Sequence, residues 1–330
     1  MSSTTDLPQA FRSRRGNLSR FVSDYGQEIV VLLATAAIFL GVGTLHPRFL
    51  GGNNLLTIFS GNAYVAIAAI GMTLVIISGH IDVSIGALIG VLATIAGTLI
   101  SKHYPVWVAW LVPVLVGIAV ETVIGVLVAY ARIPSIVVTL GMLSILRGGL
   151  ITATGGAWIS NLPPEFLIAQ WRVFGIPLPI VAMVVLTLGV AVWMRSSSTA
   201  RAIYAIGGNA EAARTTGIPI RPTTVLVFAI HGFFAGIAAL LFGTQLQVIQ
   251  STVPSNLELT VITASVIGGV SILGGTGTVI GSTLATLFFA SIGSALIFVG
   301  VSAYWLRAVL GLLILVTVLA DMVRRNRAIS

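Results

Sequence analysis

Long apolar runs separated by short polar or glycine-containing turns dominate the pattern of this chain. A helix needs about 20 apolar residues to cross the hydrocarbon core of a bilayer, and ten runs approach that length. These runs lie at 29–45, 54–78, 82–101, 106–130, 134–153, 177–194, 223–243, 256–273, 277–300 and 304–323. The pattern therefore predicts an all-α, polytopic membrane protein of about ten transmembrane helices.

Two of the connecting segments are too long to be simple turns. The segment 195–222 includes a short helix-like stretch that ends at Gly217, before Ile218 and Pro219. Since membrane insertion does not require such a helix, we expect a partner protein to contact this loop. The segment Thr154–Ile176 is rich in proline and tryptophan, which indicates a structured element at the membrane interface rather than a free linker.

The composition agrees with a membrane protein and excludes several other classes. Of 330 residues, 57% are hydrophobic and 8% are charged, with a mean hydropathy of +1.06, whereas a soluble domain carries about 25% charged residues. The absence of cysteine excludes disulfides and thiolate metal sites. We expect neither a metal site nor a cofactor.

The net charge of +8 comes from Lys and Arg residues placed between the apolar runs rather than in one basic cluster. That placement favours membrane topology over nucleic-acid binding. If the N-terminus is cytoplasmic, 12 Lys and Arg residues lie on the cytoplasmic side and 4 on the opposite side, as the positive-inside rule requires. We therefore expect both termini to be cytoplasmic, with tails at 1–28 and 324–330 around a transmembrane unit at 29–323, and the loop 195–222 on the same side.

Two glycine-rich breaks occupy matching places in the two halves of the chain. Gly86–Gly90 is echoed by Gly277–Gly281, and each follows a glycine-containing turn. Helix interruptions at corresponding positions point to a transport pathway, because freed backbone groups are tolerated where they line a cavity. Chance repetition in glycine-rich helices is the alternative. The gate candidates in these breaks are Gly79, Asp82, Gly86, Gly268, Gly269, Gly274 and Gly275.

Ionisable residues inside the predicted spans require an explanation, because charge at membrane depth is unfavourable unless it is paired or hydrated. Glu121 and Arg147 lie in the fourth and fifth spans, at depths that differ by roughly 5 Å, so we hypothesise a buried ion pair. Asp82 opens the third span, and we favour a role as helix N-cap over a place in the pathway. His80 is interpreted as a hydrogen-bonding residue of the same break, with a proton relay as the alternative, and Glu258 flanks an outer loop. Whether Glu121 or His80 contacts substrate stays open.

Four motifs then resemble one known family in order along the chain. They are Gly71–Gly86, Ile133–Gly141, Tyr204–Ala213 and Gly268–Gly277, and the resemblance extends from about Asn53 to Arg324. The family comprises permease subunits of bacterial ATP-binding-cassette importers for monosaccharides such as ribose, xylose, arabinose, galactose and rhamnose, together with the autoinducer-2 importer.

The resemblance implies a set of partners and a location. Two permease subunits, identical or homologous, surround one pathway in the inner membrane. A cytoplasmic ATPase docks beneath them, and a periplasmic binding protein delivers the substrate. Within the loop, Glu211-Ala-Ala and Gly217 resemble the family's coupling segment, which contacts the ATPase; a solvated linker is the alternative. The coupling residues implied are Asn209, Glu211, Ala212, Ala213, Gly217 and Ile218.

The sequence also departs from the family in places that bear on the substrate. Glu121 stands where a small residue is usual, and Ile124 stands where asparagine is common. The outer-loop sequence 154–159 resembles the autoinducer-2 and rhamnose branch.

Two other functional classes fit the sequence less well. An ion-coupled secondary transporter usually carries several intramembrane carboxylates, whereas only Glu121 lies deep in a predicted span. A membrane enzyme would need a metal pair, a nucleophile elbow or a carboxylate dyad, and the sequence has none of these motifs. It also lacks a phosphate-binding Gly-x-x-x-x-Gly-Lys loop. We therefore expect a transport subunit that is not itself an enzyme and that depends on ATP hydrolysis by a partner.

Overall fold

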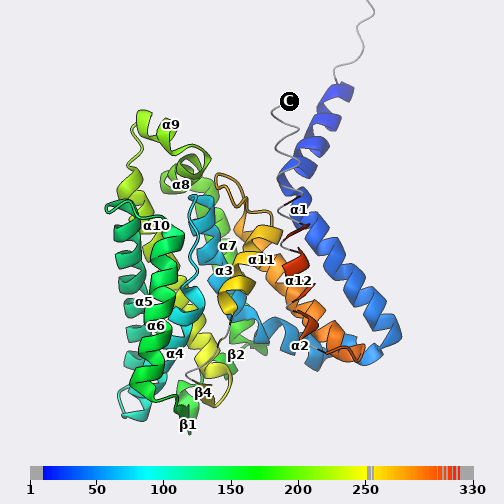
Figure 1. Ribbon diagram of the computed structural model, residues 1–330. Helices are drawn as coiled ribbons and strands as arrows, with labels where there is room; N and C mark the ends of the chain where they lie inside the picture. The colour runs from blue at the N-terminus through cyan, green and yellow to red at the C-terminus, as the bar shows by residue number, and fades with distance from the viewer. Residues whose placement is uncertain are drawn as a thin grey trace, which may run out of the picture.

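The computed structural model describes residues 10–250, 254, 256–302, 304–306, 308–309, 311–313, 315–316 and 319, with side chains from Gly26 onward. Helices account for most of these residues (Figure 1). The long helices are α1 (Ala10–Leu45), α3 (Ala63–Ile77), α4 (Ile85–Ser101), α5 (Val106–Ala129), α6 (Ser135–Thr154), α7 (Leu178–Ser196), α10 (Ile220–Gln245) and α12 (Val279–Phe298). Shorter helices are α2 (Gly52–Gly61), α8 (Ser198–Gly208), α9 (Ala210–Thr215) and α11 (Leu257–Ile267).

The helices confirm a polytopic all-α membrane protein. Within the described residues, seven helical segments are long and apolar enough to cross a membrane: Gly26–Leu45, Gly52–Ile77, Val106–Ala129, Ser135–Thr154, Leu178–Ser196, Ile220–Gln245 and Val279–Phe298. The shorter apolar helices α4 and α11 occupy two further predicted spans. The tenth predicted span, 304–323, falls partly outside the described residues, as do residues 1–9 and 324–330 of the predicted tails.

One predicted boundary is wrong by several residues. The eighth span was predicted over 256–273, but α11 ends at Ile267 and the chain then turns through a loop up to Thr278. The reason is local. Gly269, Gly274 and Gly275 all have φ between +77° and +96°, a region that glycine enters without strain but that no α-helix contains.

Helix α3 forms the centre of the packing. Every residue of this helix except Tyr64 is buried, which suits a segment that is apolar on all sides. Around it lie α2, α7, α8, α10, α11 and α12. In contrast, α1 and α6 keep many apolar side chains exposed, among them Leu33, Leu40, Ile145 and Ile151. Apolar side chains on the outside of such a bundle face lipid.

Small residues set how closely α5 and α10 approach. A methyl group on Gly232 of α10 would overlap the carbonyl group of Gly117 in α5. One turn further along α10, a methyl group on Gly236 would lie 2.5 Å from the Cα of Val114. Glycine at such positions allows two backbones to meet, and this contact fixes the rotation of α5 about its own axis.

Short strands close one end of the bundle. β1 (Trp158–Ser160) pairs antiparallel with β4 (Val248–Gln250), with Ile159 opposite Ile249, and β2 (Arg172–Val173) pairs with β3 (Ile176–Pro177). The 3-10 turns η2 (Pro164–Phe166) and η3 (Ile168–Gln170) lie between β1 and β2, and η1 (Pro47–Leu50) follows α1. The predicted outer loop is therefore structured, as expected.

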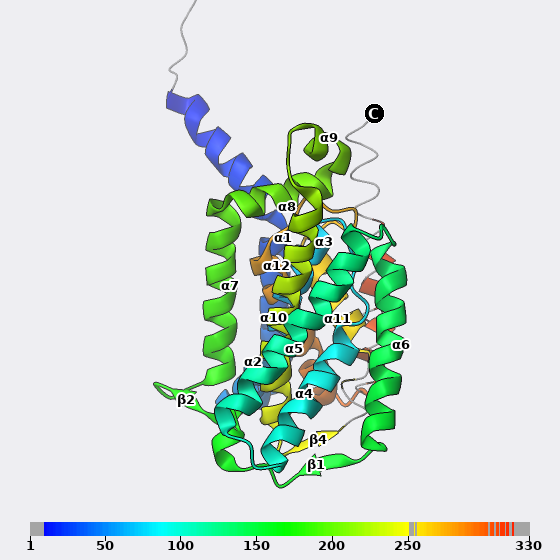
Figure 2. The same ribbon diagram turned by 90° about the vertical axis from the view of Figure 1, so that its left-hand side faces the viewer.

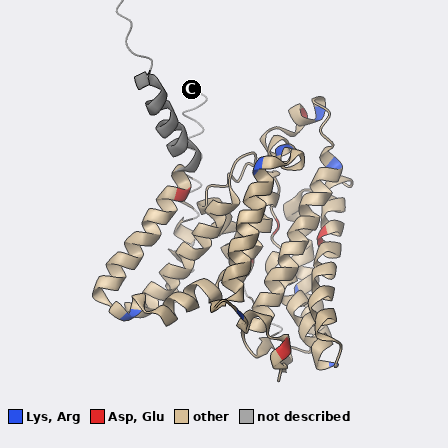
Figure 3. Ribbon diagram, turned by 180° about the vertical axis from the view of Figure 1, so that it is seen from behind, with Lys and Arg blue, Asp and Glu red and all other residues tan. Residues whose placement is uncertain are grey.

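The opposite end carries α8 and α9, with α8 lying across the bundle (Figure 2). Charged residues gather mainly at these two ends and leave the middle largely uncharged (Figure 3). This distribution suits a protein whose central band lies in hydrocarbon. Which end faces the cytoplasm stays a prediction from the basic residues.

Candidate functional site

The predicted coupling segment forms a separate short helix with a start and a stop. The Asn209 side chain accepts a hydrogen bond from the backbone N–H of Ala212 at 3.0 Å, which caps α9. At the other end Gly217 has φ +82°, and the Ile218 N–H donates to the Ala213 carbonyl at 3.1 Å. This left-handed glycine is the usual way to end a helix.

Most of α9 is exposed at the end of the molecule (Figure 1). Glu211 and Arg214 form an ion pair on its surface, with side chains 71% and 70% exposed. Asn209, Ala212 and Gly217 are also exposed, Ile218 is half-buried, and Ala213 is buried. The segment therefore presents small and charged groups to solvent, a surface that a partner can reach.

The structure brings parts of both predicted breaks together. Gly79 follows α3, and Gly274 and Gly275 belong to the loop after α11; a methyl group on Gly274 would lie 3.0 Å from the Cα of Gly79. The Gly275 N–H donates to the Ile77 carbonyl at 2.8 Å. Two breaks that are far apart in the sequence thus form one glycine junction.

Helix α8 joins the same junction, which the sequence did not reveal. A methyl group on Gly207, near the end of α8, would overlap the Ile77 carbonyl oxygen. A methyl group on Gly275 would lie 2.6 Å from the Cα of Gly208. The only available signal was the Gly207-Gly208 pair directly before Asn209. Helix α9 begins where α8 ends. The pair Gly207-Gly208 therefore connects the coupling segment to the break after α3 and to the loop after α11.

Three other glycine candidates for the gate, Gly268, Gly269 and Gly86, make contacts outside the glycine junction. Gly268 packs against Gly281 so closely that a methyl group on either would overlap the backbone of the other, and a methyl group on Gly269 would lie 3.0 Å from the Gln27 side chain of α1. Gly86 lies apart from the junction, where a methyl group would overlap the carboxylate of Glu258. The junction therefore contains three of the seven candidates, Gly79, Gly274 and Gly275, and does not include Gly86.

The loop after α11 is tied to two other elements. Gln27 donates from its side-chain amide to the Ile267 carbonyl at 3.0 Å, and the Tyr204 hydroxyl of α8 donates to the Gly277 carbonyl at 2.8 Å. Burial raises the pKa of Tyr204 above its ordinary value, so this hydroxyl keeps its proton and the bond persists.

The predicted ion pair between Glu121 and Arg147 is wrong. Arg147 of α6 instead pairs with Glu258 of α11, with Nη2 and Oε1 3.0 Å apart. Glu121 faces α10, because the Gly117–Gly232 contact fixes the rotation of α5. Depth along the hairpin does not determine which way a side chain points.

Asp82 has a different role from the predicted N-cap. Ser84 occupies the cap position before α4, and its N–H and hydroxyl donate to Asp82 Oδ1 at 2.7 and 2.6 Å. Asp82 Oδ2 lies 3.1 Å from His231 Nε2 of α10, and both side chains are fully buried. Sequence reasoning missed His231, although a histidine inside the apolar run 223–243 was a visible signal.

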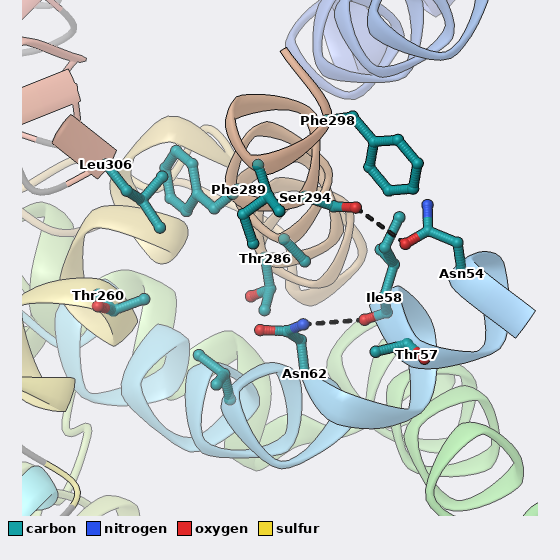
Figure 4. Close-up of a pocket in the computed structure, with 14 residues that line it drawn as sticks. Asn54, Thr57, Ile58, Asn62, Thr260, Thr286, Phe289, Ser294, Phe298 and Leu306 are labelled. Carbon is teal, nitrogen blue, oxygen red and sulfur yellow. Dashed lines mark hydrogen bonds between the residues drawn. The ribbon is translucent and has the colours of Figure 1, made fainter. Parts of the chain in front are cut away.

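A cavity of about 360 Å³ opens between α2, α11 and α12 (Figure 4). Asn62 donates from its amide nitrogen to the Ile58 carbonyl at 2.9 Å, and its amide oxygen points away from Ile58 (Figure 4). On the far wall, the Ser294 hydroxyl donates to Asn54 Oδ1 at 3.0 Å. The polar side chains of its lining are Asn54, Thr57, Asn62, Thr260, Thr286 and Ser294.

The cavity offers neutral hydrogen-bonding groups beside aromatic faces. Its described lining includes Phe289 and Phe298 but neither an acidic nor a basic residue. Pockets that bind small molecules combine apolar walls with a few polar groups in this way. The lining suits an uncharged, hydroxylated solute better than an ion.

Comparison with known proteins gives one consistent result. Residues 54–318 match the family described as branched-chain amino acid transport system / permease component. The chain is 33% identical over 296 residues to the autoinducer 2 import system permease protein LsrC of Escherichia coli (strain HS), which covers 89% of this chain and 86% of that protein. It is 34% identical over 296 residues to the proteins of the same name from Salmonella typhi and Salmonella typhimurium, covering 89% of this chain and 85% of each. No solved structure matched significantly.

Proposed function

Because this chain belongs to the branched-chain amino acid transport system / permease component family and is a multi-pass inner-membrane subunit of an ATP-binding-cassette importer, we propose that its cargo is a small, uncharged, hydroxylated solute such as autoinducer 2. The relatives' similarity over most of their length supports the same direction of transport.

The cavity between α2, α11 and α12 carries the substrate proposal. Its amides and hydroxyls can exchange hydrogen bonds with a sugar-like molecule, and Phe289 can pack against a ring or carbon face. Without a charged side chain in its described lining, the cavity has nothing to neutralise the carboxylate and ammonium groups of an amino acid. The family description names amino acid transport. The lack of charged side chains in the described lining therefore favours a sugar-like cargo over an amino acid.

Energy for transport is proposed to enter at α9. A separate ATPase binds the exposed segment Asn209–Ile218, and a binding protein delivers substrate at the opposite end, near β1 and β4. When the ATPase closes, α9 pulls on α8, and α8 shifts the glycine junction where Gly79 and Gly274 meet. A second permease copy or homologue completes the pathway, and the two subunits expose it alternately to each side. The comparisons lend no support to an ion-coupled carrier.

Uptake of labelled substrates by the assembled importer tests the cavity. We expect accumulation of labelled autoinducer 2 or a monosaccharide and no accumulation of labelled leucine. In Asn62→Ala we expect at least a tenfold loss of uptake, since a half-buried amide that orients a substrate is worth about 1.4 kcal/mol or more. Asn53→Ala is the matched control, because Asn53 is an exposed asparagine of α2, the helix that ends just before Asn62, and lies outside the cavity lining. Leucine uptake with no sugar uptake would overturn the substrate class, and equal losses in both variants would overturn the role of the cavity.

A further inference from the structure

Three ionisable side chains meet at the centre of the bundle with no exposure to solvent. Asp82 lies in the turn before α4, Glu121 on α5 and His231 on α10, and each is 0% exposed. One oxygen or nitrogen atom from each lies within 4.8 Å of the other two. Charged groups in this position are unfavourable unless something compensates them.

The contacts of Asp82 identify it as the ionised member. Its Oδ1 accepts from the Ser84 N–H at 2.7 Å and from the Ser84 hydroxyl at 2.6 Å. Its Oδ2 lies 3.1 Å from His231 Nε2. A carboxylate that accepts on both oxygens is stabilised in its charged form, and the bond from His231 requires a hydrogen on Nε2.

Glu121 is in the opposite situation. Neither of its carboxyl oxygens has a hydrogen-bond donor among the described residues, although both are buried. The close contact of α5 with α10 seals this side of the cluster, since a methyl group on Gly232 would lie 2.9 Å from Glu121 Cβ. As an ionised group, Glu121 would place a second negative charge beside Asp82 without any compensation.

The neighbouring charged groups do not compensate a negative charge on Glu121. Within the described part of the elements packed around the cluster, Arg147 is bonded to Glu258, and Arg221 lies over the Tyr130 ring at the start of α10. His80 is in the same break as Asp82, and the centroid of its ring lies 5.9 Å from that of Phe228 at an interplanar angle of 43°. None of these groups is bonded to Glu121, so compensation has to come from a bound cation or a proton.

We propose that Asp82, Glu121 and His231 form a proton-binding site inside the bundle, in which Glu121 carries the proton and shares it with Asp82. The proton removes one charge and gives Glu121 a hydrogen to donate, so a carboxylic acid faces a carboxylate. A divalent cation fits less well. His231 Nε2 is already turned to Asp82 as a donor, and its Nδ1 faces Gly71, where a methyl group would lie 2.5 Å from it.

The site links protonation to the packing of three elements. While Glu121 is protonated, α5, α10 and the turn before α4 are held together around Asp82. At alkaline pH the proton leaves, two carboxylates repel each other in a buried site, and the packing weakens. Stability is therefore expected to fall as pH rises, and the fall is expected to depend on Glu121.

Infrared spectroscopy of the full chain in detergent or lipid tests the proposal directly. The wild type is expected to show the C=O stretching band of a buried protonated carboxylic acid at neutral pH, and Glu121→Gln is expected to lack it. Glu165→Gln is the matched control, because Glu165 is an exposed glutamate in η2, and this variant should keep the band. Titration of the wild-type band to alkaline pH needs no variant and should remove it.

Thermal unfolding across pH and metal analysis complete the test. Glu121→Gln should lose the alkaline decrease in midpoint that the wild type and Glu165→Gln both show, since Gln stays neutral and nearly equal in shape. A wild type without the carboxylic acid band would overturn the proposal. So would a purified wild type that holds one divalent cation per chain and loses it in Glu121→Gln.

Discussion

At the residue scale, the buried charges find partners that neither depth nor spacing along the chain could predict. Glu121 and Arg147 were expected to meet because they lie at similar heights in neighbouring spans. Instead Arg147 reaches Glu258, which was interpreted as a residue flanking an outer loop, and Glu121 joins Asp82 and His231. Membrane proteins keep such groups when the bundle interior supplies partners.

The Arg147–Glu258 pair makes a prediction about stability. Replacing Arg147 by Met leaves Glu258 buried without its bonded partner, which should destabilise the bundle by about 1–2 kcal/mol. The value is at the lower end for a buried charge because the Arg147 side chain is 43% exposed. Denaturant or thermal unfolding in detergent measures the effect.

A double variant separates charge pairing from packing. Arg147→Met with Glu258→Gln removes both charges, so its stability should lie closer to the wild type than that of Arg147→Met alone. If the double variant is as unstable as the single one, the ion pair is not the interaction that matters.

At the element scale, helices end and meet where glycine allows it. Gly207 lets the end of α8 rest on the Ile77 carbonyl, and Gly274 lets the loop after α11 approach Gly79. The matching breaks were visible in the sequence, but the participation of α8 was not. Backbone contacts between distant segments leave no periodic signal, since only the absence of a side chain marks them.

The glycine junction predicts unequal effects for two adjacent glycines. Gly207→Ala should destabilise the protein by about 1–3 kcal/mol, because the added methyl group overlaps the Ile77 carbonyl. Gly208→Ala is the matched control. A methyl group there meets no atom within 4 Å, so its effect should stay within about 0.5 kcal/mol.

Transport measurements give the same pair of variants a functional readout. If α8 transmits movement from α9, Gly207→Ala should reduce ATP-dependent uptake more than it reduces co-purification with the ATPase. Gly208→Ala should leave both near wild type. Equal behaviour of the two variants in unfolding and uptake would contradict the role assigned to the junction.

At the scale of the whole molecule, the two ends of the bundle differ in kind. One end carries α8 and the exposed helix α9, and the other carries the strands β1 to β4 (Figures 1 and 2). The basic residues predict that the α9 end is cytoplasmic. The family resemblance drawn from the motifs is confirmed by the match over residues 54–318, whereas the orientation stays a prediction.

Labelling with a membrane-impermeant maleimide tests the orientation, and the cysteine-free chain provides a clean background. Phe174→Cys, in the fully exposed turn between β2 and β3, should react in cells whose outer membrane is permeabilised. Arg214→Cys on α9, also exposed, should react only after the inner membrane is opened. The reverse pattern would place α9 and both predicted cytoplasmic tails on the wrong side.

The sequence by itself determined the class of protein and nearly every span inside the described residues. Each span depends on the hydrophobicity of about 20 consecutive residues, which is a local property. It also located α9, since its asparagine cap and glycine stop are local signals. The tertiary structure alone decided which buried charges meet, because side-chain direction depends on helix rotation. That rotation is set by contacts such as Gly117 with Gly232, between residues more than a hundred positions apart.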